Sequence, residues 1–136
     1  MDDALQAIEL YAERGWTDGL PIVPPTEGLV ARFVEALDVA PDTVLGVEPT
    51  KGAVITAEKA AINAVMAGCR PEYMPVLAAA IDAMTAPEFG LHGISVSTMG
   101  SAVLLIVNGP IATELEMNSG VSVFGPGNRA NASIGR

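Results

Sequence analysis

The sequence predicts an α+β protein, with helices in its N-terminal part and a small β-sheet after them. Up to residue 86, apolar side chains recur with the period of amphipathic helices. After residue 93, two short runs rich in β-branched residues replace that pattern. Because helices come first and strands later, we expect α+β rather than an alternating βαβ sheet. The length of 136 residues suits a single domain, residues 1–136.

Local signals predict four helices in the first part of the chain. The first has an acidic start and ends with Arg14 before Gly15, the charge order that a helix dipole favours. A proline-rich, extended stretch follows it. Thr26 and Thr56 are typical N-caps, and Pro71 suits the first turn of a helix. The predicted ranges are residues 2–14, 27–39, 57–68 and 71–86.

Two strands are predicted next, Ile94–Met99 and Ala102–Val107, joined by a tight turn at Gly100 and Ser101. The second run is apolar on both faces, as in a central strand. We expect a short helical turn over residues 111–116, and then a glycine-rich tail that leads toward a helix cut off by the chain end.

The tail, NSGVSVFGPGNRANASIGR, is the first candidate site. Gly125, Gly127 and the amides from Asn128 onward could form a concave nest for an anion, with Arg129 as a charged fork. The alternative is a glycine-rich turn that lets two backbones approach closely. The motif is neither a Walker nor a dinucleotide-binding motif.

Asp18, Cys69 and His92 are the candidate catalytic residues, and each has a structural alternative. Asp18, in TDGLP, is either a general acid or base or an Asx-turn former. Cys69 stands just before a predicted helix, whose dipole could lower its pKa, but a lone cysteine among alanines is also typical of a buried core. His92 lies between glycines and could be a ligand, an acid or base, or a hydrogen-bonded structural residue.

Composition excludes several classes of function. The net charge is −9 and no basic cluster is present, so nucleic acid is not an expected partner. One cysteine and one histidine cannot form a disulfide framework or a Cys/His zinc site within one chain. No apolar run is long enough for a membrane span, and the acidic N-terminus lacks the basic region of a signal peptide. We therefore expect a cytoplasmic protein without a membrane partner.

Several segments resemble the N-terminal half of the bacterial UGSC family of (seleno)proteins. They are GWTDGLPIVPPTEGLV, AINAVMAGCRPEYMPVLAAAI, FGLHGI, LIVNGPI and the tail. Members of that family are longer, and their cysteine or selenocysteine motif lies in a part absent here. The resemblance implies that a set of polar residues lines a small-molecule pocket. These are Asp18, Asn63, Cys69, Arg70, Glu72, His92, Asn108, Asn118, Ser119, Asn128, Arg129 and Asn131. SVSTMGSAVLL stands where relatives have a TTHP-like stretch, so a second histidine is missing.

The sequence and the resemblance together predict a subunit of a heteromeric enzyme that acts on a small, anionic metabolite. The reaction could be thiol redox, lyase or hydrolase chemistry. A second chain would supply the C-terminal half, and with it a metal, a thiol or a selenol. The expected anion-binding residues are Asn118, Ser119, Gly125, Gly127, Asn128, Arg129 and Asn131. The hydrophobic fraction of 50% favours a permanent partner. The alternative is a non-catalytic binding or scaffolding subunit that completes a partner's fold.

Overall fold

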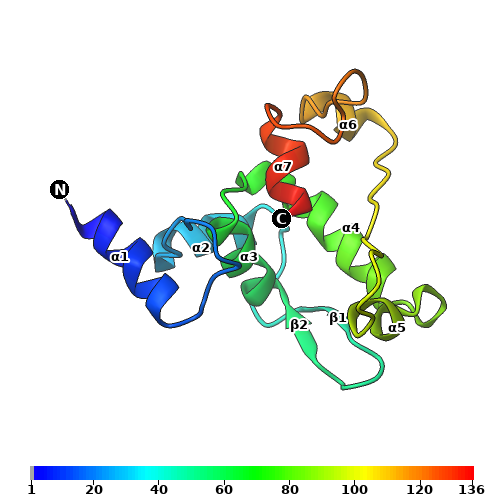
Figure 1. The fold of residues 1–136 in the computed structure, drawn as a ribbon, viewed down its shortest axis with the longest axis horizontal. Coiled ribbons are helices and arrows are strands. Elements are labelled where there is room, and N and C mark those ends of the chain that lie inside the picture. The colour runs from blue at the N-terminus through cyan, green and yellow to red at the C-terminus, as the bar shows by residue number, and fades with distance from the viewer. Residues whose placement is uncertain (1) are drawn as a thin grey trace.

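The computed structural model describes residues 2–136, and these form an α+β fold dominated by helices (Figure 1). The fold class is therefore as predicted. The elements follow one another in the order α1 Asp2–Glu13, α2 Glu27–Glu35, β1 Val44–Val47, β2 Val54–Thr56, α3 Ala57–Met66, η1 Pro71–Tyr73, α4 Met74–Thr85, η2 Pro87–Phe89, α5 Leu91–Ser95, α6 Pro110–Glu114 and α7 Arg129–Gly135.

The four N-terminal helices lie where their capping signals predict. The hydroxyl of Thr26 accepts a hydrogen bond from the amide of Leu29, and that of Thr56 accepts one from Lys59. Each bond satisfies an amide that the first helical turn leaves without a partner. Gly68, with φ of +81°, follows the end of α3 in the left-handed conformation that glycine adopts without strain. Helix α4 is preceded by the one-turn 3₁₀ helix η1, which begins at Pro71.

The sheet lies elsewhere than predicted. β1 and β2 form a two-stranded antiparallel hairpin within the connector between α2 and α3. The predicted strands Ile94–Met99 and Ala102–Val107 are wrong, because residues 91–95 form helix α5 and residues 102–107 run extended with no strand beside them. β-Propensity yields a strand only where a neighbouring strand pairs with it. In the hairpin, the carboxylate of Glu48 closes the turn by accepting from the amides of Thr50 and Lys51.

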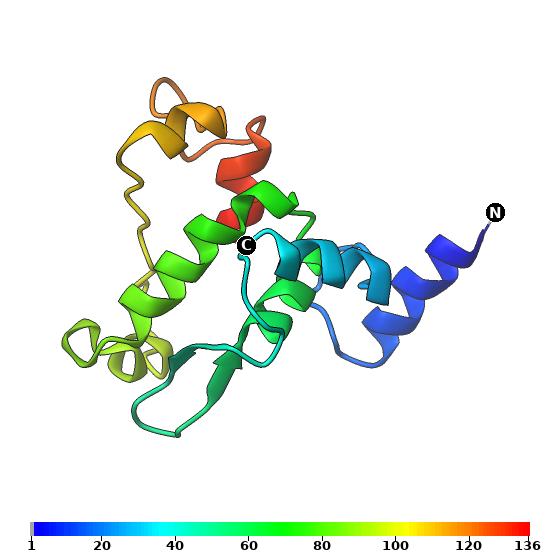
Figure 2. The same cartoon turned by 180° about the vertical axis from the view of Figure 1, so that it is seen from behind.

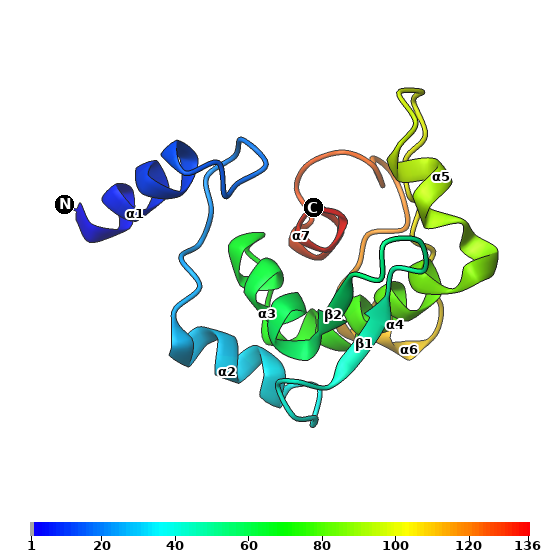
Figure 3. The same cartoon turned by 90° about the horizontal axis from the view of Figure 1, so that it is seen from below.

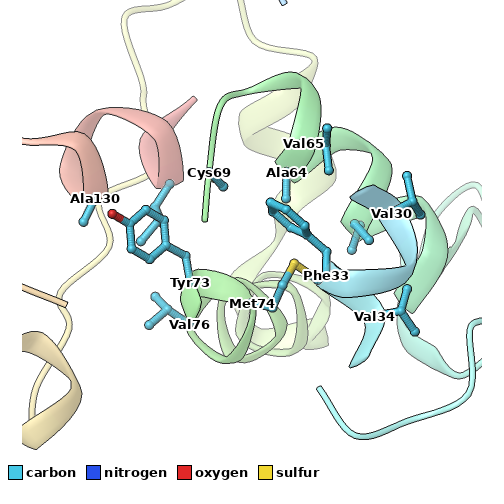
Figure 4. Packing of buried hydrophobic residues seen from close by; sticks show 13 residues of the cluster. Val30, Phe33, Val34, Ala64, Val65, Cys69, Tyr73, Met74, Val76 and Ala130 are labelled. Atoms are coloured by element: carbon cyan, nitrogen blue, oxygen red, sulfur yellow. The ribbon is translucent and has the colours of Figure 1, made fainter. Parts of the chain in front are cut away.

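The core lies where α2, α3, η1, α4 and α7 meet (Figure 4). Phe33 of α2 packs against an alanine-rich face of α3, where Ala61 and Ala64 are buried. Such small side chains let the two helices approach closely. Met74, at the start of α4, is fully buried. Ala130 and Ile134 bring α7 into the same cluster, so the C-terminal segment packs on the first half of the chain.

Helix α1 and the segment between α5 and α6 lie at the periphery of the fold. Helix α1 projects away from the body in both side views (Figures 1 and 2) and in the view from below (Figure 3). An extended segment joins α5 to α6 alongside α4 (Figure 2). The tail was expected to be a loop that leads toward a helix cut off by the chain end. Instead, its residues Arg129–Gly135 themselves form helix α7.

None of the helices in residues 2–136 combines the length and apolar character that a membrane span needs.

Candidate functional site

A cavity of about 540 Å³ lies beside α3, and its volume is in the range of small-molecule sites. Apolar side chains line most of it. We call it the Asp18 cavity, because its charged wall is formed by Asp18 and Arg136, with Lys59 nearby. Thr17, Asn63, Cys69 and Ser133 also contribute polar or thiol groups to the lining. These residues are far apart in sequence, and the packing of α7 against the end of α3 brings them together.

Asp18 and Arg136 form a bidentate ion pair. Arg136 Nη2 donates to Asp18 Oδ1 at 2.6 Å, and Nε donates to Oδ2 at 2.7 Å. The amide of Leu20 also donates to Oδ1, which makes the Asx turn that TDGLP predicts. The bond from Arg136, with that from Leu20, lowers the pKa of Asp18 from 3.8 to about 2. Asp18 is therefore ionised at neutral pH and cannot act there as a general acid.

Lys59 and Asn63 face the cavity from α3. They stand four residues apart, a spacing that places side chains on one helical face. Lys59 Nζ donates to the carbonyl of Val54 at 2.9 Å, which is one of the three hydrogen bonds an ammonium group can donate. Asn63 Nδ2 donates to the carbonyl of Lys59 at 2.8 Å. Lys59 can thus hold an anion without leaving its present position.

Cys69 is a buried thiol in this cavity and only 5% exposed (Figure 4). Its Sγ donates to the carbonyl of Ser133 at 3.3 Å. Burial raises the pKa of Cys69 above its ordinary value of 9.0. The thiol form therefore prevails at neutral pH, whereas a nucleophilic cysteine needs a lowered pKa.

Arg129 does not line the Asp18 cavity. Its Nε donates to the carbonyl of Gly68 at 3.0 Å, and its Nη2 donates to that of Cys69 at 3.3 Å. These are carbonyl groups at the C-terminal end of α3, where a cation also complements the helix dipole. The guanidinium thus joins α7 to α3.

The asparagines predicted to bind an anion are occupied within the fold. Asn128 caps α7 by accepting from the amide of Asn131, and it donates to the carbonyl of Glu116 at 2.7 Å. Asn131 Nδ2 donates to the carbonyl of Asn118, whose own amide donates back to Asn131 Oδ1. The amide of Gly125 donates to the carbonyl of Ser122 at 2.7 Å. Gly127, with φ of +114°, reverses the chain just before α7, and Ser119 is exposed.

His92 stands apart from the other two candidate catalytic residues. It belongs to α5 and does not line the Asp18 cavity. Its neighbour is Glu48, whose pKa is lowered first by the amide of Lys51, then by Thr50, and least by the nearby His92. Asp18 and Cys69 therefore share a cavity, and His92 lies at the turn of the hairpin.

Sequence reasoning overlooked Lys59 and Arg136, the two basic residues of the cavity, of which Arg136 is paired with Asp18. For Lys59, the spacing to Asn63 on a helix was an available signal. For Arg136, no local signal exists, because its partner Asp18 is 118 residues away. Within residues 2–136, no group of three or more His, Cys, Asp and Glu side chains is placed to hold a metal ion.

Comparison with known proteins found no protein family, no curated protein and no solved structure that matches this chain. The likeness to the UGSC family therefore remains a prediction.

Proposed function

We propose that this chain is one subunit of a heteromeric enzyme that acts on a small anionic metabolite, and that it supplies the wall that binds the anion. The observation that carries the proposal is the Asp18 cavity. It has the size of a metabolite site, it is largely apolar, and a few polar groups converge in it. Lys59 gives it the positive charge that an anion requires, because the charge of Arg136 is paired with that of Asp18.

The pKa directions of Asp18 and Cys69 favour a binding role over proton transfer for this subunit. The pKa of Asp18 is about 2 and that of Cys69 is raised, so neither is near neutrality, where a general base or a thiolate nucleophile works best. We infer that the group that reacts with the substrate comes from the partner chain. This agrees with the resemblance to the UGSC family, whose cysteine or selenocysteine motif lies in the other half.

Trp16 provides a direct test, because this single tryptophan lines the cavity and its fluorescence responds to its surroundings. Titration with a small dicarboxylate such as succinate, or with inorganic phosphate, is expected to change the fluorescence with saturation. The neutral diamide of succinate should leave it unchanged. Lys59→Met is expected to weaken binding by roughly ten- to a hundredfold, as for a lost hydrogen bond to a charged group.

Lys51→Met is the matched control, because Lys51 is the other lysine of the chain and lies in the hairpin turn, outside the cavity. Both variants change the net charge equally. An equal loss of affinity in the two variants would show that only overall charge matters. A fluorescence signal that stays flat with every anion would likewise refute the proposed binding role.

A scaffolding subunit is the second candidate, and one observation favours it. Arg129, Asn118, Asn128 and Asn131 all make hydrogen bonds that hold the tail to the rest of the fold. In that case the polar tail stabilises the subunit, and the partner forms the whole substrate site. The anion titration separates the two candidates, since a scaffolding subunit binds no anion at Lys59.

A further inference from the structure

We propose that a second cavity, on the α2 side of α3, is a docking groove for a basic amphipathic helix of a partner protein. Its volume is about 1120 Å³, which is larger than the usual range of small-molecule sites. Residues of α2 and α3 line it together with Tyr11 near the end of α1. We call it the acidic groove, after the charge of its rim. It is distinct from the Asp18 cavity, and Trp16, Asn63 and Met66 form the wall between the two, because they line both.

The floor of the acidic groove is apolar. Val30 and Val34 of α2 form it together with Ile62 and Met66 of α3. Trp16, a residue that is 55% exposed, also lines the groove. The ring of Tyr11 meets that of Trp16 edge to face at 5.5 Å, which holds the aromatic wall in place. A groove between two helices with an aromatic wall accepts the apolar face of a third helix.

The charges around the groove determine which helix fits. Every charged residue that lines it is acidic, and these are Glu27, Glu35, Asp38 and Glu58. Because the whole chain carries a net charge of −9, its long-range field also attracts cations. Lysine or arginine side chains beside an apolar stripe would therefore pair with this rim while the stripe covers Ile62, Met66 and Trp16.

Helix α1 of a second copy does not fit this description. It is amphipathic and projects from the body, but it carries four acids, Asp2, Asp3, Glu9 and Glu13, and no base. Placing it in the acidic groove would bring like charges together, which disfavours binding. The chemistry of the groove thus selects another chain, whose helix is basic.

The test uses a peptide of about 18 leucine and lysine residues with the leucines at helical spacing, and a counterpart with glutamate in place of lysine. Trp16 fluorescence is expected to report saturable binding of the lysine peptide and no binding of the glutamate peptide. Glu35→Gln combined with Asp38→Asn should weaken the lysine peptide by about three- to tenfold, as for two surface ion pairs. Asn is well suited to position 38, because Asp38 has φ of +52° and asparagine tolerates that conformation.

Glu88→Gln combined with Glu114→Gln is the matched control, since it removes the same charge away from the groove. It should change the affinity for the lysine peptide by less than about twofold.

The proposal is overturned if both double variants weaken binding equally, or if the lysine peptide does not bind. It is also overturned if the chain self-associates and Leu5→Glu abolishes that association, because α1 of a second copy then fills the groove. Lys59→Met should leave peptide binding unchanged, which separates this test from that of the Asp18 cavity.

Discussion

The carboxylate of Asp18 accepts hydrogen bonds from two sources, the guanidinium of Arg136 and the amide of Leu20. The guanidinium also donates to the carbonyl of Pro21 at 2.9 Å. A single arginine therefore fixes the conformation of the DGLP turn and places a charge at the cavity. At the residue scale, structure and binding depend on the same contacts, and a variant of either residue affects both.

Titration of Asp18 gives the prediction at this scale. In the folded protein its carboxyl should titrate at about pH 2 instead of 3.8, which carbon NMR of the carboxyl group measures. Because the pKa is lower in the folded state, the ion pair stabilises the protein fully above pH 3.8, and this contribution disappears as the pH falls through 2. The urea midpoint should therefore fall over this interval.

Arg136→Gln should raise the pKa of Asp18 toward 3.8 and reduce the fall in the urea midpoint. Arg32→Gln is the control, because Arg32 is an exposed residue of α2 and is not among the groups that shift the pKa of Asp18. If the Asp18 carboxyl of the wild-type protein titrates with a midpoint near pH 3.8, the ion pair is contradicted.

At the scale of elements, helices were predictable and strands were not. Thr26 and Thr56 signal helix starts within a few residues of sequence, and both cap helices in the structure. A strand needs a partner, and the connector of residues 45–55 contains its own partner across the turn at Glu48. The apolar run Ala102–Val107 has a stronger β-pattern but no partner among residues 2–136. The candidate site was predictable only in part, since Asp18 and Cys69 share a cavity through packing that local sequence does not reveal.

Packing of the hairpin on α4 provides the prediction at this scale. A Cβ placed on Gly46 would lie 2.5 Å from Thr85 Oγ1 and 3.0 Å from Ile81 Cγ2. Thr85 cannot easily move away, because its hydroxyl donates to the carbonyl of Ile81 at 2.8 Å. Gly46→Ala should therefore lower the free energy of unfolding, measured in urea, by about 1–3 kcal/mol.

Gly28→Ala is the matched substitution, since a Cβ there meets no atom within 4 Å and the residue lies within α2. It should raise the free energy of unfolding by roughly 0.5–1 kcal/mol, because alanine favours the helix. In a Thr85→Ala background, Gly46→Ala should cost less than about half as much, because the nearest clashing atom, Thr85 Oγ1, is gone and only Ile81 Cγ2 remains close. An equal cost in both backgrounds would refute this contact.

At the scale of the whole molecule, an extended segment without main-chain hydrogen bonds lies beside α4. Residues 102–108 make no main-chain hydrogen bond with any other part of residues 2–136. Leu105 and Val107 pack against the core, whereas Leu104 and Ile106 are 62% and 75% exposed. This alternation is that of a strand with one face covered. Both of its edges remain open to pairing, so the segment suits a central strand in a sheet that a partner chain completes.

Hydrogen exchange tests this inference directly. In the isolated chain, the amides of residues 102–108 should exchange as fast as those of an unstructured peptide, because water is their only partner. The amides of residues 61–66 in α3 serve as the internal control and should be protected, since they lie in the core. In a complex with the proposed partner, residues 102–108 should become protected, while α3 changes little.

If the amides of this segment are already protected in the isolated monomer, a strand from another subunit is not needed to complete the fold. Fast exchange that persists in the complex would place the partner on a different face.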